Sequence, residues 1–137
     1  MDGGTRCGGA AVSDAADFLE RLVQRFPQLG EDLEVHVENN GGALPHVFFG
    51  LDVTPAVVEA YRCDTEGREA GEYAELDWRG LLGFFEEVYP AAPLPVKEVI
   101  VTSFLMDLPW PHEPGYGLVG CLGPVLAWKF VQVRPGG

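Results

Sequence analysis

Basic residues are scarce in this chain of 137 residues. Nine lysines and arginines stand against 21 aspartates and glutamates, and the net charge at pH 7 is −12 with histidine neutral. A surface of this sign repels nucleic-acid phosphates and anionic lipid headgroups, so neither nucleic acid nor a membrane is expected as a partner. The charge instead favours basic partners, which are a cationic protein, a cationic ligand or a metal ion.

Cysteine is also scarce. Cys7, Cys63 and Cys121 cannot all pair, and none of them stands in a CxxC spacing. A disulfide framework is therefore not expected, and a reducing cytoplasm suits the chain best. The first residues include Asp2 and no apolar stretch, and no apolar run approaches the roughly 18 residues of a membrane span. We therefore expect a cytoplasmic protein without a signal peptide.

Recognisable catalytic motifs are missing as well. There is no Gly-x-Ser-x-Gly elbow and no phosphate-binding glycine loop. His46 lies in an apolar segment and is expected in the core, whereas His112 is expected in an exposed loop. Cys121 follows an apolar stripe and is expected to be buried, and Cys63 ends a predicted helix. A metal or thiol enzyme that uses His46, His112 or Cys63 is the function hypothesis with the least support.

Helical periodicity is what the sequence has in abundance. Ser13 or Asp14 caps the first predicted helix, and Pro27 ends it. Thr54-Pro55 is read as the start of another helix, and Asp77 caps a third. The predicted helices cover residues 13–26, 54–62, 77–90 and 95–108. Residues 31–38 alternate like a strand but have helix-capping signals at both ends, and 125–133 suit either structure.

These segments predict a mostly α-helical fold. We expect one domain over residues 13–134, with five or six helices and a minor strand pair as an alternative, behind a flexible tail at 1–12. The predicted helices 77–90 and 95–108 have equal length and a short proline connector, like one helical hairpin of an α-solenoid. The acidic, glycine-broken segment 64–75 is expected to be an exposed, mobile loop.

Three sequence motifs resemble a family of small bacterial proteins to which no reaction is assigned. The motifs are "LPHVFFGLD", "VKEVIVTSFLMDLP" and "LVGCLGPVL", which are similar to a family pattern LPHxxFGD, SFLxxL and LGPxL. The matching positions are Leu44, Pro45, His46, Phe49, Gly50, Asp52, Glu98, Ile100, Ser103, Phe104, Leu105, Leu108, Leu122, Gly123, Pro124 and Leu126. The chain departs from the pattern by the extra residue Leu51 and by Met106-Asp107. The resemblance implies a mostly helical fold, which favours helix at 31–38. Some such small acidic proteins are encoded beside secreted toxins as immunity proteins.

The acidic residues are concentrated in two segments. Residues 31–38 contain four acids and no base, and residues 59–87 contain nine acids against three arginines. Clustered acids create a negative field that attracts a basic partner, although the alternative, a surface that only keeps the protein soluble, is slightly favoured. The proline-rich stretch "PWPHEPGY" adds two aromatic residues that suit either a packed corner or a binding loop. The predicted partner-binding residues are Glu31, Asp32, Glu34, Glu38, Glu66, Glu69, Glu72, Glu75, Trp110 and Tyr116.

Together these observations predict a non-enzymatic interaction protein with no cofactor. The first hypothesis is an acidic neutraliser of a basic toxin or of a similar enzyme. The alternative is a helical scaffold or adaptor module, which the predicted hairpin suggests.

Overall fold

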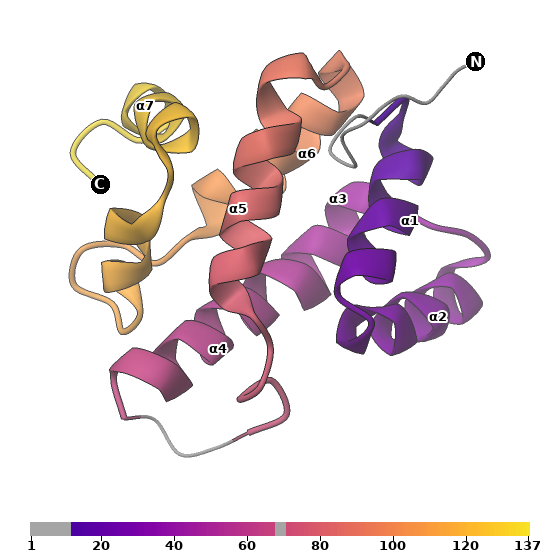
Figure 1. Cartoon of the computed structure of the whole chain (residues 1–137), viewed down its shortest axis with the longest axis horizontal. Coiled ribbons are helices and arrows are strands. Elements are labelled where there is room, and N and C mark those ends of the chain that lie inside the picture. The colour runs from indigo at the N-terminus through magenta and orange to yellow at the C-terminus, as the bar shows by residue number, and fades with distance from the viewer. Residues whose placement is uncertain (1–11, 68–70) are drawn as a thin grey trace.

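The computed structural model describes residues 12–67 and 71–137, and in this part of the chain it contains seven α-helices and no strand (Figure 1). The prediction of a mostly helical single domain is confirmed, and the helix alternative holds for both 31–38 and 125–133. The helices are α1 (Ala15–Arg25), α2 (Gln28–Asn40), α3 (Pro45–Phe48), α4 (Thr54–Thr65), α5 (Trp78–Val88), α6 (Leu94–Ser103) and α7 (Pro124–Val133). Residues 1–11 of the predicted tail, and Glu69, lie outside the described residues. None of the described helices has both the length and the apolar character to cross a membrane.

Two predicted caps start their helices. The Asp14 carboxylate accepts a hydrogen bond of 2.8 Å from the Asp17 N–H at the start of α1. The Asp17 carboxylate in turn accepts the N–H of Ser13, the residue before the cap. Asp77 accepts the Gly80 N–H at 2.9 Å and starts α5 in the same way. These carboxylates satisfy N–H groups that have no partner within the helix.

Helices α3 and α4 form one continuous helix joined by a π-helical turn, Phe49–Val53 (Figure 1). The Thr54 N–H donates to the Phe49 carbonyl, one residue farther back than in an α-helix. The prediction that Thr54 caps a new helix is therefore wrong. Pro55 has no N–H, and its ring would clash with a carbonyl of a regular α-turn; the wider π turn accommodates it. The Thr54 hydroxyl donates to the Ser103 carbonyl at 2.7 Å instead of capping α4.

Phenylalanines occupy the centre of the domain. Phe18 of α1 stacks on Phe49 of the π turn at 5.6 Å and on Phe84 of α5 at 6.0 Å between ring centroids. Phe85 contacts Phe49 at 5.6 Å and meets Phe104 edge-on at 5.0 Å. These five rings are almost completely buried. Aromatic pairs in such geometries contribute beyond the area they bury, so this cluster holds α1, α5 and the π turn together.

The two helices of the predicted hairpin, α5 and α6, pack mainly against other helices rather than against each other. Helix α5 packs against α4 and α7, and α6 packs against α3. Helix α6 also ends at Ser103 rather than at residue 108, because Phe104 leaves the helical conformation (φ −121°, ψ −66°) where its ring enters the core. A short 3₁₀ turn, Leu105–Asp107, follows.

Arg134 fastens the start of the proline-rich loop (residues 109–116), and the turn before it, to the end of α7. Its side chain is only 3% exposed, and its guanidinium donates to four carbonyls, those of Leu105, Leu108, Pro109 and Gly137. The Trp110 ring covers the guanidinium at 3.8 Å. Burial lowers the pKa of Arg134. The guanidinium has five N–H donors in a planar fork, so it can bind four carbonyls at once, whereas a lysine ammonium has only three donors.

Glu86 of α5 caps the distant helix α7. Its carboxylate accepts the Val125 N–H at 2.7 Å and the Leu126 N–H at 3.0 Å. A β-carbon on Gly123 would lie 2.5 Å from the Glu86 carboxyl carbon, so a larger residue there would displace the carboxylate from the cap. Pro124 occupies the first helical position, where its missing N–H costs nothing. The "LGP" motif therefore has a structural explanation in this contact.

Arg134→Lys should destabilise the fold on the order of 3 kcal/mol, because several buried carbonyls would lose their donor while the charge stays buried. The free energy of unfolding in urea measures this. Arg79→Lys is the control, since Arg79 is largely exposed beside Asp64 and its replacement should cost less than about 0.5 kcal/mol. Equal losses in the two variants would contradict the role given to Arg134.

Glu86→Ala should lower the free energy of unfolding by about 1–2 kcal/mol, because two N–H groups of the first turn of α7 would lose their acceptor. Glu87→Ala, at an exposed neighbouring position, should change stability by less than about 0.5 kcal/mol. Thermal and urea unfolding of the two variants checks this. A Glu86 variant as stable as the Glu87 variant would show that the cap contributes nothing.

Candidate functional site

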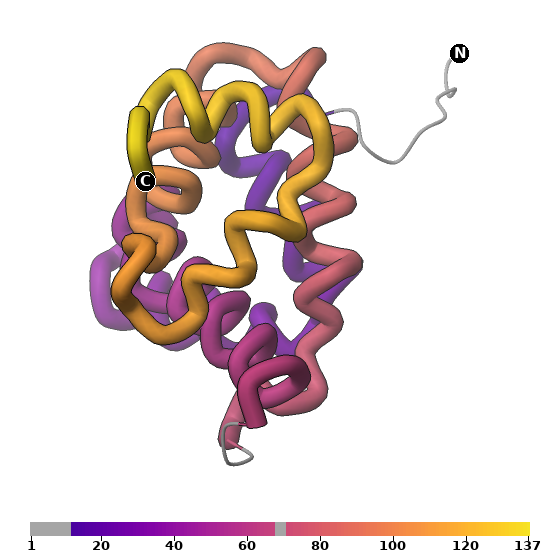
Figure 2. The backbone as a smooth tube through the Cα atoms, turned by 90° about the vertical axis from the view of Figure 1, so that its left-hand side faces the viewer, coloured from indigo at the N-terminus to yellow at the C-terminus, as the bar shows by residue number. Residues whose placement is uncertain are grey.

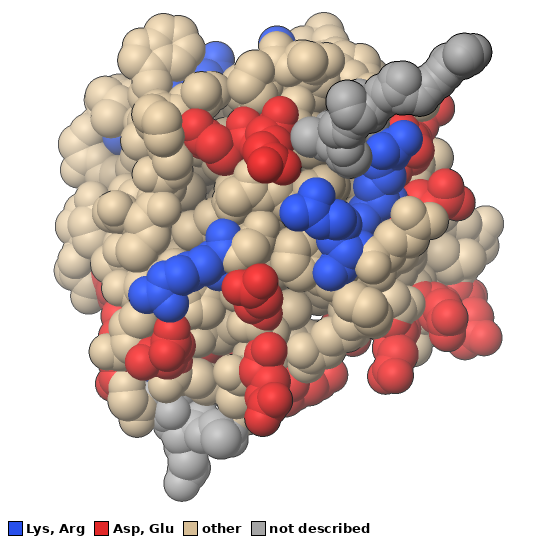
Figure 3. Space-filling model, in the orientation of Figure 1, with Lys and Arg blue, Asp and Glu red and all other residues tan. Residues whose placement is uncertain are grey.

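Helix α2 turns a stripe of glutamates outward. Leu29 and His36 face the domain and are buried. Glu31, Glu34 and Glu38 are spaced three and four residues apart, so they share the opposite side of the helix, and all are exposed. Among the described residues, none of the three forms an ion pair with a basic side chain. Figure 3 shows red side chains along the lower edge of the molecule, where α2 lies.

His36 orients α2 relative to the start of α3. Its Nε2 accepts the Leu44 N–H at 3.0 Å, which places the ring proton of the neutral form on Nδ1. The Asn40 side-chain amide donates to the His36 carbonyl at 2.8 Å. The imidazole is only 4% exposed and packs on Phe48. His36 is therefore a structural residue that sets the position of the glutamate stripe.

A hollow of about 260 Å³ lies between α2 and the π turn, next to the stripe. Two carboxylates line it, Asp32 from α2 and Asp52 from the π turn, together with the apolar side chains of Val35 and Leu51. Leu51 is 71% exposed. Burial raises the pKa of Asp52, and the charge of Asp32 raises it further. Two carboxylates and two apolar side chains suit the ammonium or guanidinium group of a lysine or arginine with its aliphatic stem.

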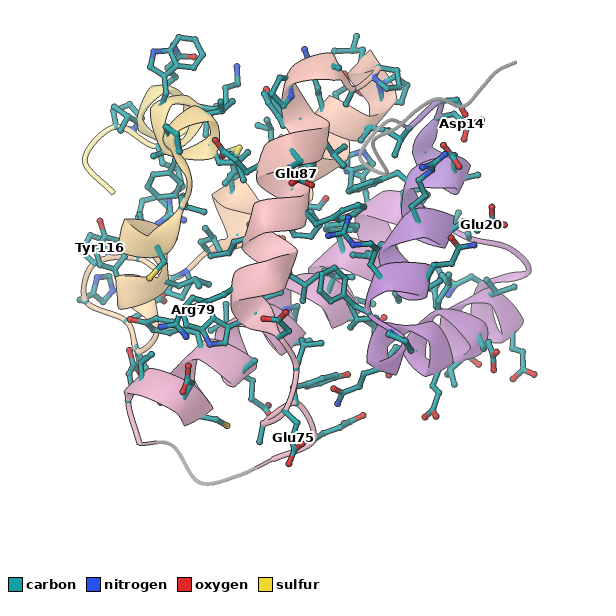
Figure 4. All side chains as sticks on the ribbon, in the orientation of Figure 1. Asp14, Glu20, Glu75, Arg79, Glu87 and Tyr116 are labelled. Atoms are coloured by element: carbon teal, nitrogen blue, oxygen red, sulfur yellow. The ribbon has the colours of Figure 1, made fainter. Side chains whose placement is uncertain are left out.

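The segment after α4 joins this surface through hydrogen bonds. The Tyr73 hydroxyl donates to Asp32 at 2.7 Å, and Gln28 of α2 donates to the Glu72 carbonyl. Burial and the Asp32 carboxylate raise the pKa of Tyr73 well above its usual range, so the hydroxyl remains a donor. Figure 4 places the nearby Glu75 at the bottom edge of the molecule. We call the surface formed by these segments the acidic face; its members are Glu31, Asp32, Glu34, Glu38, Asp52, Glu72 and Glu75.

Glu66 does not belong to this surface. Helix α4 continues to Thr65, so the predicted loop begins two residues later than residue 64. The Glu66 carboxylate accepts the Arg62 Nε–H at 3.1 Å and the Gly115 N–H at 3.0 Å. Gly115 has a left-handed backbone (φ 91°), and a β-carbon there would lie 3.0 Å from Val58. Glu66 therefore pins the proline-rich loop to the end of α4.

The proline-rich loop is a packed corner that leaves part of its aromatic surface exposed. Trp110 covers Arg134 with one face and remains 45% exposed. The Trp110 N–H donates to the Glu113 carboxylate at 2.9 Å. Figure 4 places Tyr116 at the left side of the molecule, away from α2 at the lower right. The structure therefore does not bring Trp110 and Tyr116 together with the glutamates of α2.

Two of the nucleophile and base candidates, His46 and Cys121, lie in other environments than predicted. His46 is exposed rather than buried, and its Nδ1 lies 2.9 Å from the Ser103 hydroxyl at the end of α6. Cys121 is exposed rather than buried, because it lies at the end of a 3₁₀ turn, Tyr116–Cys121, that turns it outward. His112 is exposed, as predicted. Within the described residues, no three His, Cys, Asp or Glu side chains converge as a metal site.

A larger hollow of about 560 Å³ lies between α4 and the proline-rich loop. Glu59, Arg62, Asp107 and Glu113 are the charged residues that line it. Arg62 pairs with Glu66, and Glu113 accepts the Trp110 N–H. These two charges serve to hold the corner in place.

No family model, curated protein or solved structure matches the chain. The family resemblance described above stays a prediction.

Asp52 is not among the predicted partner-binding residues, because it follows an apolar stretch of the sequence and lies outside both acidic segments. Leu51, the extra residue relative to the resembled pattern, lies in the π turn. The sequence does contain one indication of the π turn, which is Pro55 inside a helical segment. Such a proline often coincides with a local change of helix geometry. The turn adds one residue to the helix, and Asp52 lines the hollow beside α2.

Asp52→Asn should stabilise the protein at neutral pH. Because the pKa of Asp52 is raised, the folded protein binds more protons at this carboxyl than the unfolded chain does when the pH lies between the usual aspartate pKa and the raised one. The free energy of unfolding therefore falls as pH rises through this range. The variant removes this penalty; its gain should be present at pH 7 and absent below the usual aspartate pKa. Urea unfolding at several pH values tests this. The exposed control Glu87→Gln should show no such pH-dependent gain, and a gain of equal size there would contradict the assignment.

Proposed function

We propose that this chain is a non-enzymatic interaction protein that binds a basic protein through the acidic face. The observation that carries the proposal is the outward stripe of α2, in which Glu31, Glu34 and Glu38 are exposed and have no basic ion-pair partner among the described residues. The stripe lies beside the hollow that Asp32 and Asp52 line.

The stripe is unfavourable for α2 itself. Like charges three and four residues apart repel each other by a few tenths of a kcal/mol per pair. Glu38 lies near the C-terminus of the helix, where the helix dipole disfavours an acid, and the last turn contains no base. A basic partner would relieve both costs. Residues that disfavour their own local structure are expected where function requires them.

The hollow offers a place for one anchoring side chain. A lysine or arginine of the partner would lie between Asp32 and Asp52, with its aliphatic stem along Val35 and Leu51. The cation would lower the free energy of the ionised Asp52, whose pKa burial raises. A desolvated charged anchor surrounded by steering charges is an arrangement found in tight protein interfaces.

In its specific form, the proposal is that the partner is a basic toxin or a similar enzyme that the protein neutralises. The net charge of −12 and the resemblance to small acidic bacterial proteins support this form. Binding would inhibit such an enzyme if the acidic face covered its cationic substrate-binding surface. Co-expression with the captured partner, scored by growth, tests this form separately from binding.

Glu34→Lys combined with Glu38→Lys should abolish capture of the partner while the domain stays folded, since lysine near the end of α2 suits the helix dipole. The immobilised protein is exposed to a lysate of its native organism, and the bound proteins are identified by mass spectrometry. Association with the captured protein is then timed at low and high salt; salt should slow it strongly.

Glu20→Lys combined with Glu87→Lys is the matched control, with the same change in net charge on α1 and α5 (Figure 4). The control should retain capture. If both double variants capture the same basic protein as the unmodified chain, the stripe only increases solubility and the proposal is wrong.

A further inference from the structure

The C-terminal end of the chain is free of acids. Residues 114–137 contain no aspartate or glutamate and two bases, Lys129 and Arg134, whereas all 21 acids lie in the preceding residues. Arg134 is buried. The upper left of Figure 3, where α7 lies, is mostly uncharged. In a protein of net charge −12, this end is the part that least repels another copy of the molecule.

Helix α7 is apolar on both of its sides. Leu126 and Phe130 face the core and are buried. Trp128 is 64% exposed and Val131 is 66% exposed on the other side. Lys129 is the only charged residue of the helix. A helix that is apolar all round is normally covered on all sides, and tryptophan is enriched at protein interfaces.

A hollow of about 380 Å³ separates α7 from α6 beside this surface. Both lysines of the chain, Lys97 and Lys129, line it, and Glu98 contributes a carboxylate. Leu94, which is 67% exposed, and Val133 add apolar walls. The surface therefore combines an uncharged centre with both signs of charge at its edge. We call it the α7 face; its members are Leu94, Lys97, Glu98, Trp128, Lys129 and Val131.

We infer that the α7 face binds the α7 face of a second copy of this chain, around a two-fold axis. Such a contact is self-complementary when its centre is uncharged and its edge contains both signs. Trp128 and Val131 of each copy cover those of the other, and Lys129 of one copy pairs with Glu98 of the partner subunit. The acids of the two copies then lie far apart, because the acidic face and the α7 face are at opposite ends of the molecule (Figures 1 and 2).

The geometry has a consequence for the proposed function. A dimer of this kind presents two acidic faces that point away from each other. The inference itself stands on the α7 face alone and does not require a basic partner.

Salt separates this contact from binding at the acidic face. Two copies of net charge −12 repel each other, so screening by salt strengthens the dimer. Association of the acidic face with a basic protein weakens as salt rises, since the charges there attract. The two contacts therefore respond to salt with opposite sign.

Sedimentation equilibrium of the full chain over a concentration series, at low and high salt, tests the inference. We expect a dimer whose dissociation constant falls as salt rises. Val131→Glu adds an acid beside the two-fold axis and should weaken the dimer about tenfold or more, as should Trp128→Ser. Leu51→Glu is the control, because Leu51 is at least as exposed but lies beside α2; this variant should dimerise like the unmodified chain. Circular dichroism and thermal unfolding verify that each variant folds.

Three results would overturn the inference. The first is a monomer at every concentration and salt level. The second is a dimer that Leu51→Glu weakens as much as Val131→Glu does. The third is a monomer whose α7 face binds an acidic amphipathic peptide or a vesicle of anionic lipid, and which loses that binding in Val131→Glu. This result would show that the α7 face binds a different partner.

Discussion

The position of Phe49 constrains much of this structure. Its ring is held between Phe18 of α1 and Phe85 of α5, with both centroids at 5.6 Å. Because the ring is fixed in the core, the residue added by the π turn is displaced toward solvent. Leu51 consequently protrudes, Asp52 lines the hollow beside α2, and the Thr54 hydroxyl reaches the Ser103 carbonyl. A core contact thus determines the shape of a surface on the other side of the same helix.

Sequence patterns predicted the elements that depend on local rules. Asp14 and Asp77 were recognisable as caps because a carboxylate satisfies N–H groups within the next three residues. The α2 glutamates were recognisable because their charge is local. Local sequence patterns do not predict long-range hydrogen bonds. Glu66 has the sequence context of an ordinary loop acid, yet its carboxylate accepts the N–H of Gly115, 49 residues away. Nothing in the sequence around Arg134 indicates that its guanidinium binds carbonyls that lie 25 to 29 residues earlier.

The two ends of the molecule carry different physical properties. The α2 end has repelling acids and a hollow with two carboxylates, whereas the α7 end has apolar side chains and both lysines. Each end is locally unfavourable in water, one through like-charge repulsion and the other through exposed apolar area. Such surfaces are expected where a protein meets partners, and their separation would allow both proposed contacts to form at once.

The contacts that complete the domain come last along the chain. The N–H groups that the Glu86 carboxylate accepts lie 39 and 40 residues downstream. The Leu108 carbonyl, just before the proline-rich loop, likewise binds a donor near the end of the chain, Arg134. While the chain is being synthesised, α1 to α6 can collapse around the phenylalanines, but the Glu86 carboxylate and the loop carbonyls must remain hydrated until α7 and Arg134 emerge from the ribosome. A chain that stops before Arg134 therefore lacks the donor that binds the carbonyls of Leu105, Leu108 and Pro109, and these carbonyls remain hydrated.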